Sequence, residues 1–184
     1  MLSPEENHAR ALLGASRAYA QRAVELLCKD ARLRDRVPLP LRPAIAAEID
    51  RFHLFLIFSS LRDKEHRDRS FFERVHDSLR ALFVETETRR LLSLREELAG
   101  VPEGRRIWED LRPERDPLEP YYGSFDDGCK TLESSPFAIV ARRVSDRFFR
   151  EDAPVAYDLV LSIALDTADR LTQEVDNVDE GTGA

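Results

Sequence analysis

The stretch Phe52-His53-Leu54-Phe55-Leu56-Ile57-Phe58 is the only strongly apolar run in this chain. The chain as a whole is very polar, since 34% of its 184 residues are charged and its mean hydropathy is −0.43. A helix that is apolar on every side must be buried on every side. We therefore expect this run to form the centre of the core, with His53 as the one polar side chain inside it.

The residues around the run predict a helix from about 43 to 62. Apolar side chains recur at helical spacing along one face of it, at Ile45, Ile49, Phe52 and Leu56. Three prolines at positions 38, 40 and 43 precede or open this helix. Each proline disfavours the helical conformation of its predecessor, so a stiff extended connection is expected before the helix.

Capping signals predict two more helices in the first hundred residues. Ser3-Pro4-Glu5-Glu6 has the pattern of a capping box with proline at the first helical position, for a helix that ends near Arg32. Ser70-Phe71-Phe72-Glu73 has the pattern of a second capping box, for a helix that ends near Leu98. Gly100 and Pro102 follow, as is typical beyond a helix end.

The segment from 102 to 135 differs in composition, because it contains four prolines and three glycines. We expect irregular structure with short helices there. Ser135-Pro136 and Asp152-Ala153-Pro154 then predict the starts of two further helices, of which the second ends near Val175. Residues 176–184 are expected to form a disordered acidic tail.

No stretch of five or more residues alternates with the period of a strand. Residues 1–175 are therefore predicted to form a single all-α domain, a bundle of five to six helices with a proline-rich connecting segment at 102–135. The helix at 43–62 is expected to be the hub on which the other helices pack.

The charge of the chain narrows the classes of function. A net charge of −7 and a pI of about 5.2 argue against a nucleic-acid partner, although the 25 arginines leave room for a basic face.

No apolar run approaches the roughly 20 residues of a membrane span, and no signal-peptide pattern opens the chain. Cys28 and Cys129 have no neighbour at metal-ligand or redox spacing. We expect a cytoplasmic protein without a membrane partner or a cofactor.

Two carboxylate–histidine pairs raise the hypothesis of a metal site. Asp50 precedes His53 by three residues, and Glu73 precedes His76 by three, so each pair shares one helix face. Helical bundles direct carboxylate and imidazole ligands at di-metal centres in this way. The competing interpretation makes each histidine a core residue that is hydrogen-bonded to a neighbouring carboxylate or carbonyl.

The segment Arg69-Ser-Phe-Phe-Glu-Arg-Val-His76 resembles the Arg-x(4–6)-His motif of HEPN-type ribonucleases, which are helical bundles. The resemblance implies that Arg69 and His76 would act on the scissile phosphate of RNA. It covers only these residues, and Ser70 departs from the Asn, Asp or His that usually follows the arginine. The competing interpretation is a solvated Arg69 and a His76 that packs against its neighbours.

Aromatic and acidic residues gather in Tyr121-Tyr122-Gly123-Ser124-Phe125-Asp126-Asp127-Gly128, on a segment bounded by proline. Such a composition is typical of a recognition loop. We expect contacts with a partner from Tyr121, Tyr122, Phe125, Asp126 and Asp127; the alternative is that the aromatic residues complete the core.

The sequence as a whole favours a non-enzymatic helical bundle that acts through protein–protein interaction, in a regulatory, adaptor or immunity-type role. The acidic charge suits a basic protein partner, because opposite charges accelerate association. A second copy of the chain is a further candidate partner.

Overall fold

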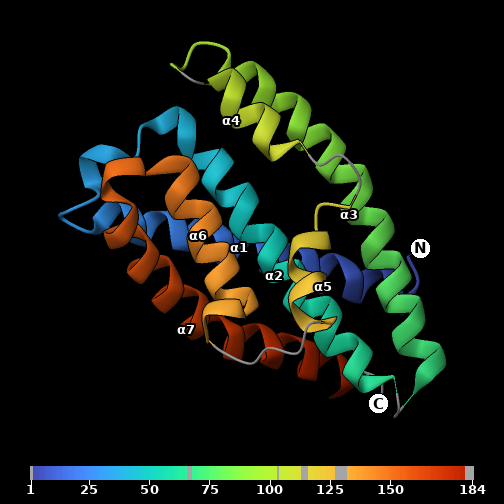
Figure 1. Ribbon diagram of the computed structural model, residues 1–184. Helices are drawn as coiled ribbons and strands as arrows, with labels where there is room; N and C mark the ends of the chain where they lie inside the picture. The colour runs from blue at the N-terminus through green and yellow to red at the C-terminus, as the bar shows by residue number, and fades with distance from the viewer. Residues whose placement is uncertain (1, 66–67, 103, 113–115, 127–131, 181–184) are drawn as a thin grey trace.

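The computed structural model describes residues 2–65, 68–102, 104–112, 116–126 and 132–180, and in these residues it contains seven α-helices and no strand. The predicted all-α fold is confirmed. The helices, shown in Figure 1, are α1 (Pro4–Lys29), α2 (Arg42–Lys64), α3 (Arg69–Leu98), α4 (Gly104–Leu111), α5 (Glu119–Asp126), α6 (Pro136–Phe148) and α7 (Ala153–Glu180).

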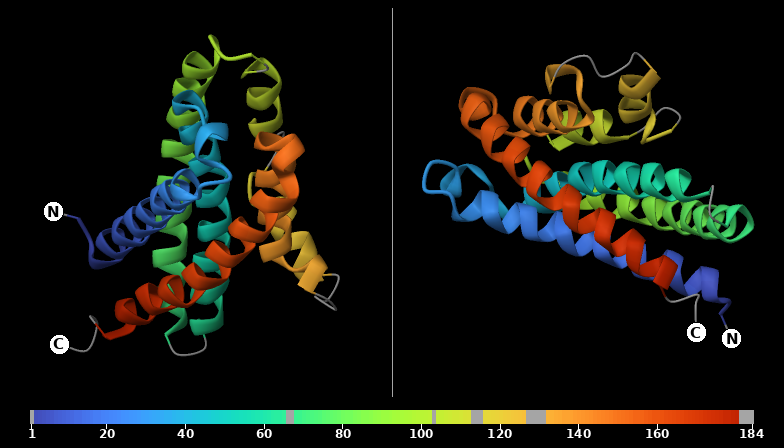
Figure 2. Two further views of the ribbon diagram at one scale, coloured as in Figure 1. Left: turned by 90° about the vertical axis from the view of Figure 1, so that its left-hand side faces the viewer. Right: turned by 90° about the horizontal axis from the view of Figure 1, so that it is seen from below.

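Helix α2 is the centre of the bundle, and it contacts α1, α3, α5, α6 and α7. In the right-hand view of Figure 2, α2 and α3 lie between a layer formed by α1 and α7 and another formed by α4, α5 and α6. Phe52, Leu54, Phe55 and Ile57 are completely buried, as is His53. The apolar run therefore has the position that its composition predicts.

Two of the predicted helix starts have the expected caps. The Ser3 hydroxyl accepts a hydrogen bond from the backbone N–H of Glu6 at 3.2 Å, and the Ser3 N–H donates to the Glu6 carboxylate at 2.8 Å. The Ser135 hydroxyl accepts from the N–H of Ala138. Each cap satisfies a backbone donor that the first helical turn leaves free.

The predicted cap at Ser70 is wrong, because α3 begins two residues earlier, at Arg69, than a cap at Ser70 would place it. The Asp68 carboxylate accepts from the N–H of Phe71 at 3.1 Å and is the N-cap. Ser70 consequently lies inside the first turn, where its hydroxyl donates to Asp68 instead. Aspartate and serine are about equally good N-caps, so cap preference by itself does not favour Ser70 over Asp68.

The C-terminal helix extends further than predicted. Helix α7 continues to Glu180 rather than ending near Val175, so residues 176–180 do not belong to a disordered tail. Leu171, Val175 and Val178 are all nearly fully buried and continue one apolar stripe, which holds the last turn against the bundle. Residues 181–184 lie outside the described part of the chain.

Candidate functional site

The four predicted metal ligands do not come together. Asp50 and His53 lie in the core on α2, whereas Glu73 and His76 lie on a partly exposed part of α3. Glu73 accepts a hydrogen bond from Arg69 at 2.7 Å instead of facing the histidines. Across the described ranges, no three His, Cys, Asp or Glu side chains form a group that could hold a metal ion. The geometry thus gives no support to a metal site built from these residues.

His53 has the structure of a core histidine. Its Nδ1 lies 3.2 Å from the carbonyl oxygen of Ser16, which can only accept, so Nδ1 carries the proton. Its Nε2 is buried and has no hydrogen-bond partner in the described structure. Burial lowers the pKa of His53 to about 4, against the opposing effects of the Ser16 carbonyl and Asp50. The ring is therefore neutral at physiological pH.

The pair Arg69 and His76 is not assembled as a catalytic site. The Arg69 side chain is 81% exposed, and its Nε donates to Glu73. The His76 ring packs against Phe58 with 4.8 Å between ring centroids, and its Nδ1 lies 3.5 Å from Asp77. The structure joins Arg69 and His76 by no hydrogen bond, and each has the surroundings that the competing interpretation predicts.

The two tyrosines of α5 have different environments. Tyr121 is completely buried between Phe52 and Phe55, with ring centroids 5.8 and 5.7 Å away, so it is a core residue and not the partner contact that the sequence suggested. The reason is packing, since α5 turns this ring inward onto α2. Tyr122 is half-buried and stays available to a partner. The side chains of Phe125 and Asp126, and all of Asp127, lie outside the described structure.

A group of buried and half-buried charges surrounds α2, and no sequence pattern described above predicted it. We call it the charge cluster, and it consists of the carboxylates of Glu48, Asp50 and Glu87 and the guanidiniums of Arg17, Arg51, Arg90, Arg143 and Arg147. The one available signal was the sequence Glu48-Ile-Asp50-Arg51 directly before the apolar run, in a helix that had to be buried. Charged residues are almost never fully buried unless they are paired, so these positions implied partners.

Glu48 forms the first half of the charge cluster. It is fully buried and bonds to Arg143 and, at 2.8 Å, to Arg147, both from α6. It also accepts from the Tyr121 hydroxyl at 3.1 Å. Burial alone would raise the pKa of Glu48, but Arg143, Arg51 and Arg147 outweigh it and hold the pKa at about 2. The carboxylate therefore stays charged and fastens α6 and α5 to α2.

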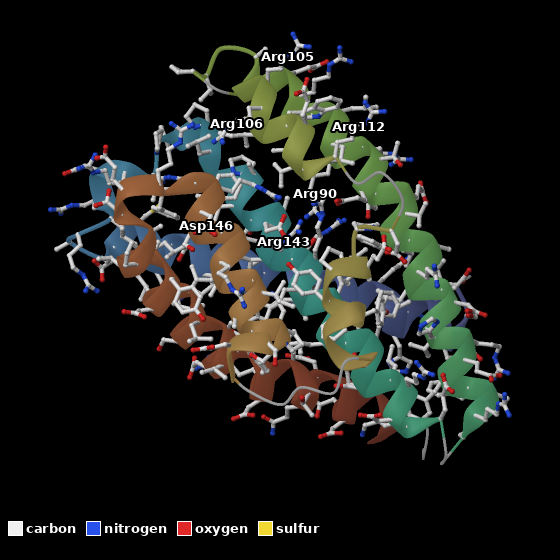
Figure 3. The ribbon with its side chains drawn as sticks, in the orientation of Figure 1. Arg90, Arg105, Arg106, Arg112, Arg143 and Asp146 are labelled. Carbon is white, nitrogen blue, oxygen red and sulfur yellow. The ribbon has the colours of Figure 1, made fainter. Side chains whose placement is uncertain are left out.

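Glu87 and Asp50 form the second half. Arg51 donates to Glu87 at 2.9 and 2.7 Å and to the carbonyl oxygen of Leu111 at 2.7 Å, at the end of α4. Arg90 donates to Asp50 at 2.6 Å and also binds Glu87. Figure 3 shows Arg90 from α3 and Arg143 from α6 directed toward the same central region. The charge cluster thus links α2 with α3, α4 and α6.

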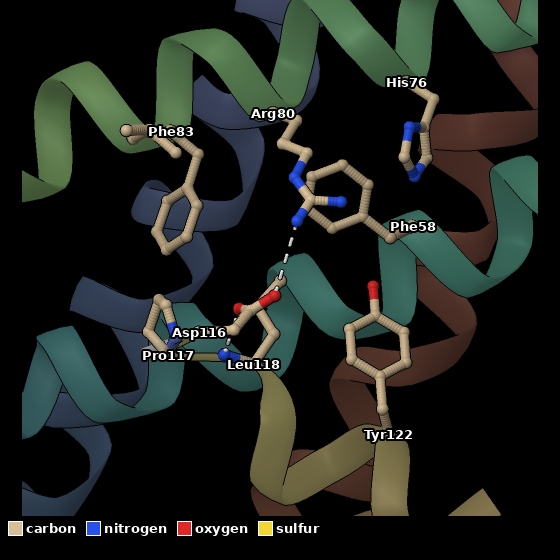
Figure 4. A pocket seen from close by; sticks show the side chains of 9 residues that line it. Phe58, His76, Arg80, Phe83, Asp116, Pro117, Leu118 and Tyr122 are labelled. Carbon is tan, nitrogen blue, oxygen red and sulfur yellow. Dashed lines mark hydrogen bonds and ion pairs between the residues drawn. The ribbon is translucent and has the colours of Figure 1, made fainter. Parts of the chain in front are cut away.

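A pocket of about 350 Å³ lies between α2, α3 and the segment that leads into α5. We call it the Tyr122 pocket. Its apolar walls are Phe58, Phe83, Val84, Pro117 and Leu118, and its polar groups are His76, Arg80, Asp116 and Tyr122. Figure 4 shows the Tyr122 hydroxyl and the His76 ring on one side of the pocket, and Arg80 with Asp116 on another.

The polar groups of the Tyr122 pocket are incompletely paired. Arg80 and Asp116 form an ion pair at 3.6 Å, and both side chains are well exposed. The Tyr122 hydroxyl makes no hydrogen bond to another described residue, and burial together with Asp116 raises its pKa. Ligand sites in proteins are mostly apolar, of roughly 300–1,000 Å³, with a few convergent polar groups. The Tyr122 pocket has this composition and size, which makes it the strongest candidate site.

Comparison with known proteins adds no assignment: no family model, no curated protein and no solved structure matches this chain. Within the described ranges, no helix is long and apolar enough to cross a bilayer. What the site can do therefore follows from its own residues and their geometry.

Proposed function

We propose that this chain is a non-enzymatic binding protein that acts through contact with another protein, and that the Tyr122 pocket receives an apolar side chain of this partner. The observation that carries the proposal is a half-open cavity with apolar walls formed by Phe58, Phe83 and Leu118. In protein interfaces, a few large side chains that enter such pockets contribute most of the binding free energy.

The surface beside the pocket supports a protein rather than an enclosed small molecule. Val84 lines the pocket and is nevertheless 59% exposed, so the apolar area continues onto the outer face of α3. A small ligand inside the pocket would leave this part of Val84 in water. A partner segment that lies across α3 would cover it and gain free energy from its burial.

The residues of the pocket also indicate the chemistry of the partner segment. The rings of Phe58, His76 and Tyr122 favour an aromatic anchor, because aromatic rings gain energy from edge-to-face contacts. The exposed ion pair of Arg80 and Asp116 can open at little cost and offers Asp116 to a basic residue beside the anchor. The net charge of −7 would speed the approach of such a basic partner.

A photo-crosslinking residue at position 84 tests the proposal. It should capture one protein from cells of the source, while the same residue at the exposed position 165 on α7 should not. The affinity of the captured protein is then measured with purified variants. V84E should weaken binding at least tenfold, because it places a charge where an apolar contact is needed, and Y122A should weaken it similarly.

The matched control for this measurement is L165E, which places the same charge on an exposed leucine of α7. Leu165 and Val84 are both exposed, so both variants should keep the fold, which circular dichroism verifies. If V84E and L165E bind the captured protein equally well, the pocket is not the contact site and the proposal fails.

A further inference from the structure

A second pocket, of about 250 Å³, lies between α1, α2 and α3, on residues separate from those of the Tyr122 pocket. We call it the Arg17 pocket. Arg17 and Gln21 line it from α1, Pro43 and Asp50 from α2, and Thr86 and Arg90 from α3. Two guanidiniums therefore line one pocket, and none of the residues of this pocket also lines the Tyr122 pocket.

Arg17 has unused hydrogen-bonding capacity in this pocket. Its Nη2 donates to the Thr86 hydroxyl at 2.6 Å, but its Nε is buried and donates to no described residue. The nearest carboxylate oxygen, from Asp50, is 3.9 Å from Nε, which is beyond hydrogen-bond distance. An acceptor from outside the chain cannot reach the buried Nε, but the Arg17 side chain is 37% exposed and offers its other guanidinium N–H groups.

The charge of Asp50 does not block an anion here. Its carboxylate is 1% exposed and already accepts from the Ser16 hydroxyl at 2.5 Å and from Arg90 at 2.6 Å. Asp50 thus holds Arg90 in place, while its ion pair with Arg17 is longer, at 3.9 Å, and is not a hydrogen bond. Pro43, in the first turn of α2, adds the positive end of a long helix to the same pocket, where a negative charge is favoured.

We propose that the Arg17 pocket binds a phosphate group, held between the guanidiniums of Arg17 and Arg90. Guanidinium forks match the oxygen atoms of phosphate, and two of them with a helix N-terminus favour a dianion over a singly charged carboxylate. The phosphate belongs either to free inorganic phosphate or to a small phosphate monoester. The volume of the pocket leaves space for the short organic part of such an ester.

Titration calorimetry on the full chain tests the proposal, with inorganic phosphate and glycerol phosphate added at constant ionic strength against a chloride reference. We expect saturable binding of at least one of the two at a single site. Tighter binding of glycerol phosphate would identify a monoester as the ligand, and tighter binding of inorganic phosphate would identify the free ion. Absence of saturable binding of both would overturn the proposal.

Variants locate the bound phosphate. R17Q should weaken binding at least tenfold, and R17K should restore part of it, because lysine keeps the charge and loses the fork. The control is R89Q, which removes an exposed arginine of α3 that pairs with Glu85 and should leave binding unchanged. Equal losses in R17Q and R89Q would show unspecific charge attraction and overturn the site.

A variant at a residue outside the charge cluster tests the site without disturbing the ion pairs of the cluster. Gln21 is exposed and has no role in the charge cluster, so Q21E should fold normally and weaken phosphate binding by adding a negative charge at the pocket. V84E should bind phosphate as the unmodified chain does. The outcome at this pocket is therefore distinguishable from the outcome at the Tyr122 pocket.

Discussion

Single residues of α2 show how a bundle can hold charges at its centre. The Arg51 side chain is 2% exposed, yet it donates to Glu87 and to the carbonyl oxygen of Leu111, so its charge and its donors are compensated. Glu48 is likewise surrounded by donors from α2, α5 and α6. Buried ion pairs add little net stability, but removing one member leaves the others buried without a partner.

Removing the charge of Glu48 should therefore destabilise the fold strongly. In E48Q, the guanidiniums of Arg51, Arg143 and Arg147 lose their common counter-charge, and we expect the free energy of unfolding to fall by about 3 kcal/mol. Urea unfolding measures this loss. The control E85Q removes an exposed carboxylate that pairs with Arg89 and should change stability by less than about 0.5 kcal/mol. Equal effects of the two variants would contradict the role of Glu48.

The turn between α3 and α4 depends on a glycine other than the expected Gly100. A Cβ atom at Gly104 would lie 1.9 Å from the carbonyl oxygen of Leu98, whereas a Cβ atom at Gly100 would meet nothing within 4 Å. Gly104 also donates its N–H to Val101 at 2.8 Å. The close approach of two helix ends thus requires Gly104, while Gly100 occupies open space.

The two glycines give a matched pair of variants. G104A should force α4 away from the end of α3 and lower the free energy of unfolding by about 1–3 kcal/mol or more, as overpacking does. G100A should change it by less than about 0.5 kcal/mol, as exposed substitutions do. Trp108, the one tryptophan, lies on α4 with the guanidiniums of Arg95 and Arg112 stacked on its ring at 5.4 and 5.5 Å, so its fluorescence reports the displacement. A spectral change in G100A alone would contradict this assignment.

Buried titratable groups make the stability of the bundle depend on pH. The folded pKa of His53 is about 4 against an ordinary value of 6.5, so the unfolded chain takes up this proton first as the pH falls. The stability contributed by neutral His53 is present above pH 6.5 and is lost between 6.5 and 4. The corresponding window for Glu48, with a folded pKa of about 2 against 4.5, lies between pH 4.5 and 2.

We expect the free energy of unfolding to decrease by about 3 kcal/mol through the His53 window, since each pKa unit corresponds to about 1.4 kcal/mol. H53Q keeps a side-chain donor for the Ser16 carbonyl but does not titrate, so its stability should stay nearly constant from pH 6.5 to 4.5. Below pH 4.5, its profile should fall as that of the unmodified chain does. Urea unfolding across pH measures both curves, and parallel profiles above pH 4.5 would show that His53 is not responsible.

Local patterns of the sequence determined the helices and the central position of α2. The capping box at Ser3, the cap at Ser135 and the apolar run at 52–58 act within one turn or one face of a helix, so neighbouring residues suffice to predict them. The errors at Ser70 and Val175 displaced helix ends and not helices, because cap preferences are nearly degenerate and burial continues an apolar stripe.

The positions of the candidate binding groups and of the buried charges depend on tertiary contacts. Tyr121 and Tyr122 are neighbours in sequence, yet packing on α2 buries one and leaves the other at a pocket. Two of the partners of Glu48 come from α6, almost a hundred residues away, and Arg17 donates to Thr86 on α3. No local spacing encodes such pairings, because they depend on how helices far apart in the chain are placed against one another. Local sequence patterns are thus sufficient for a helical bundle around α2, whereas the Tyr122 pocket, the Arg17 pocket and the charge cluster depend on contacts between distant helices.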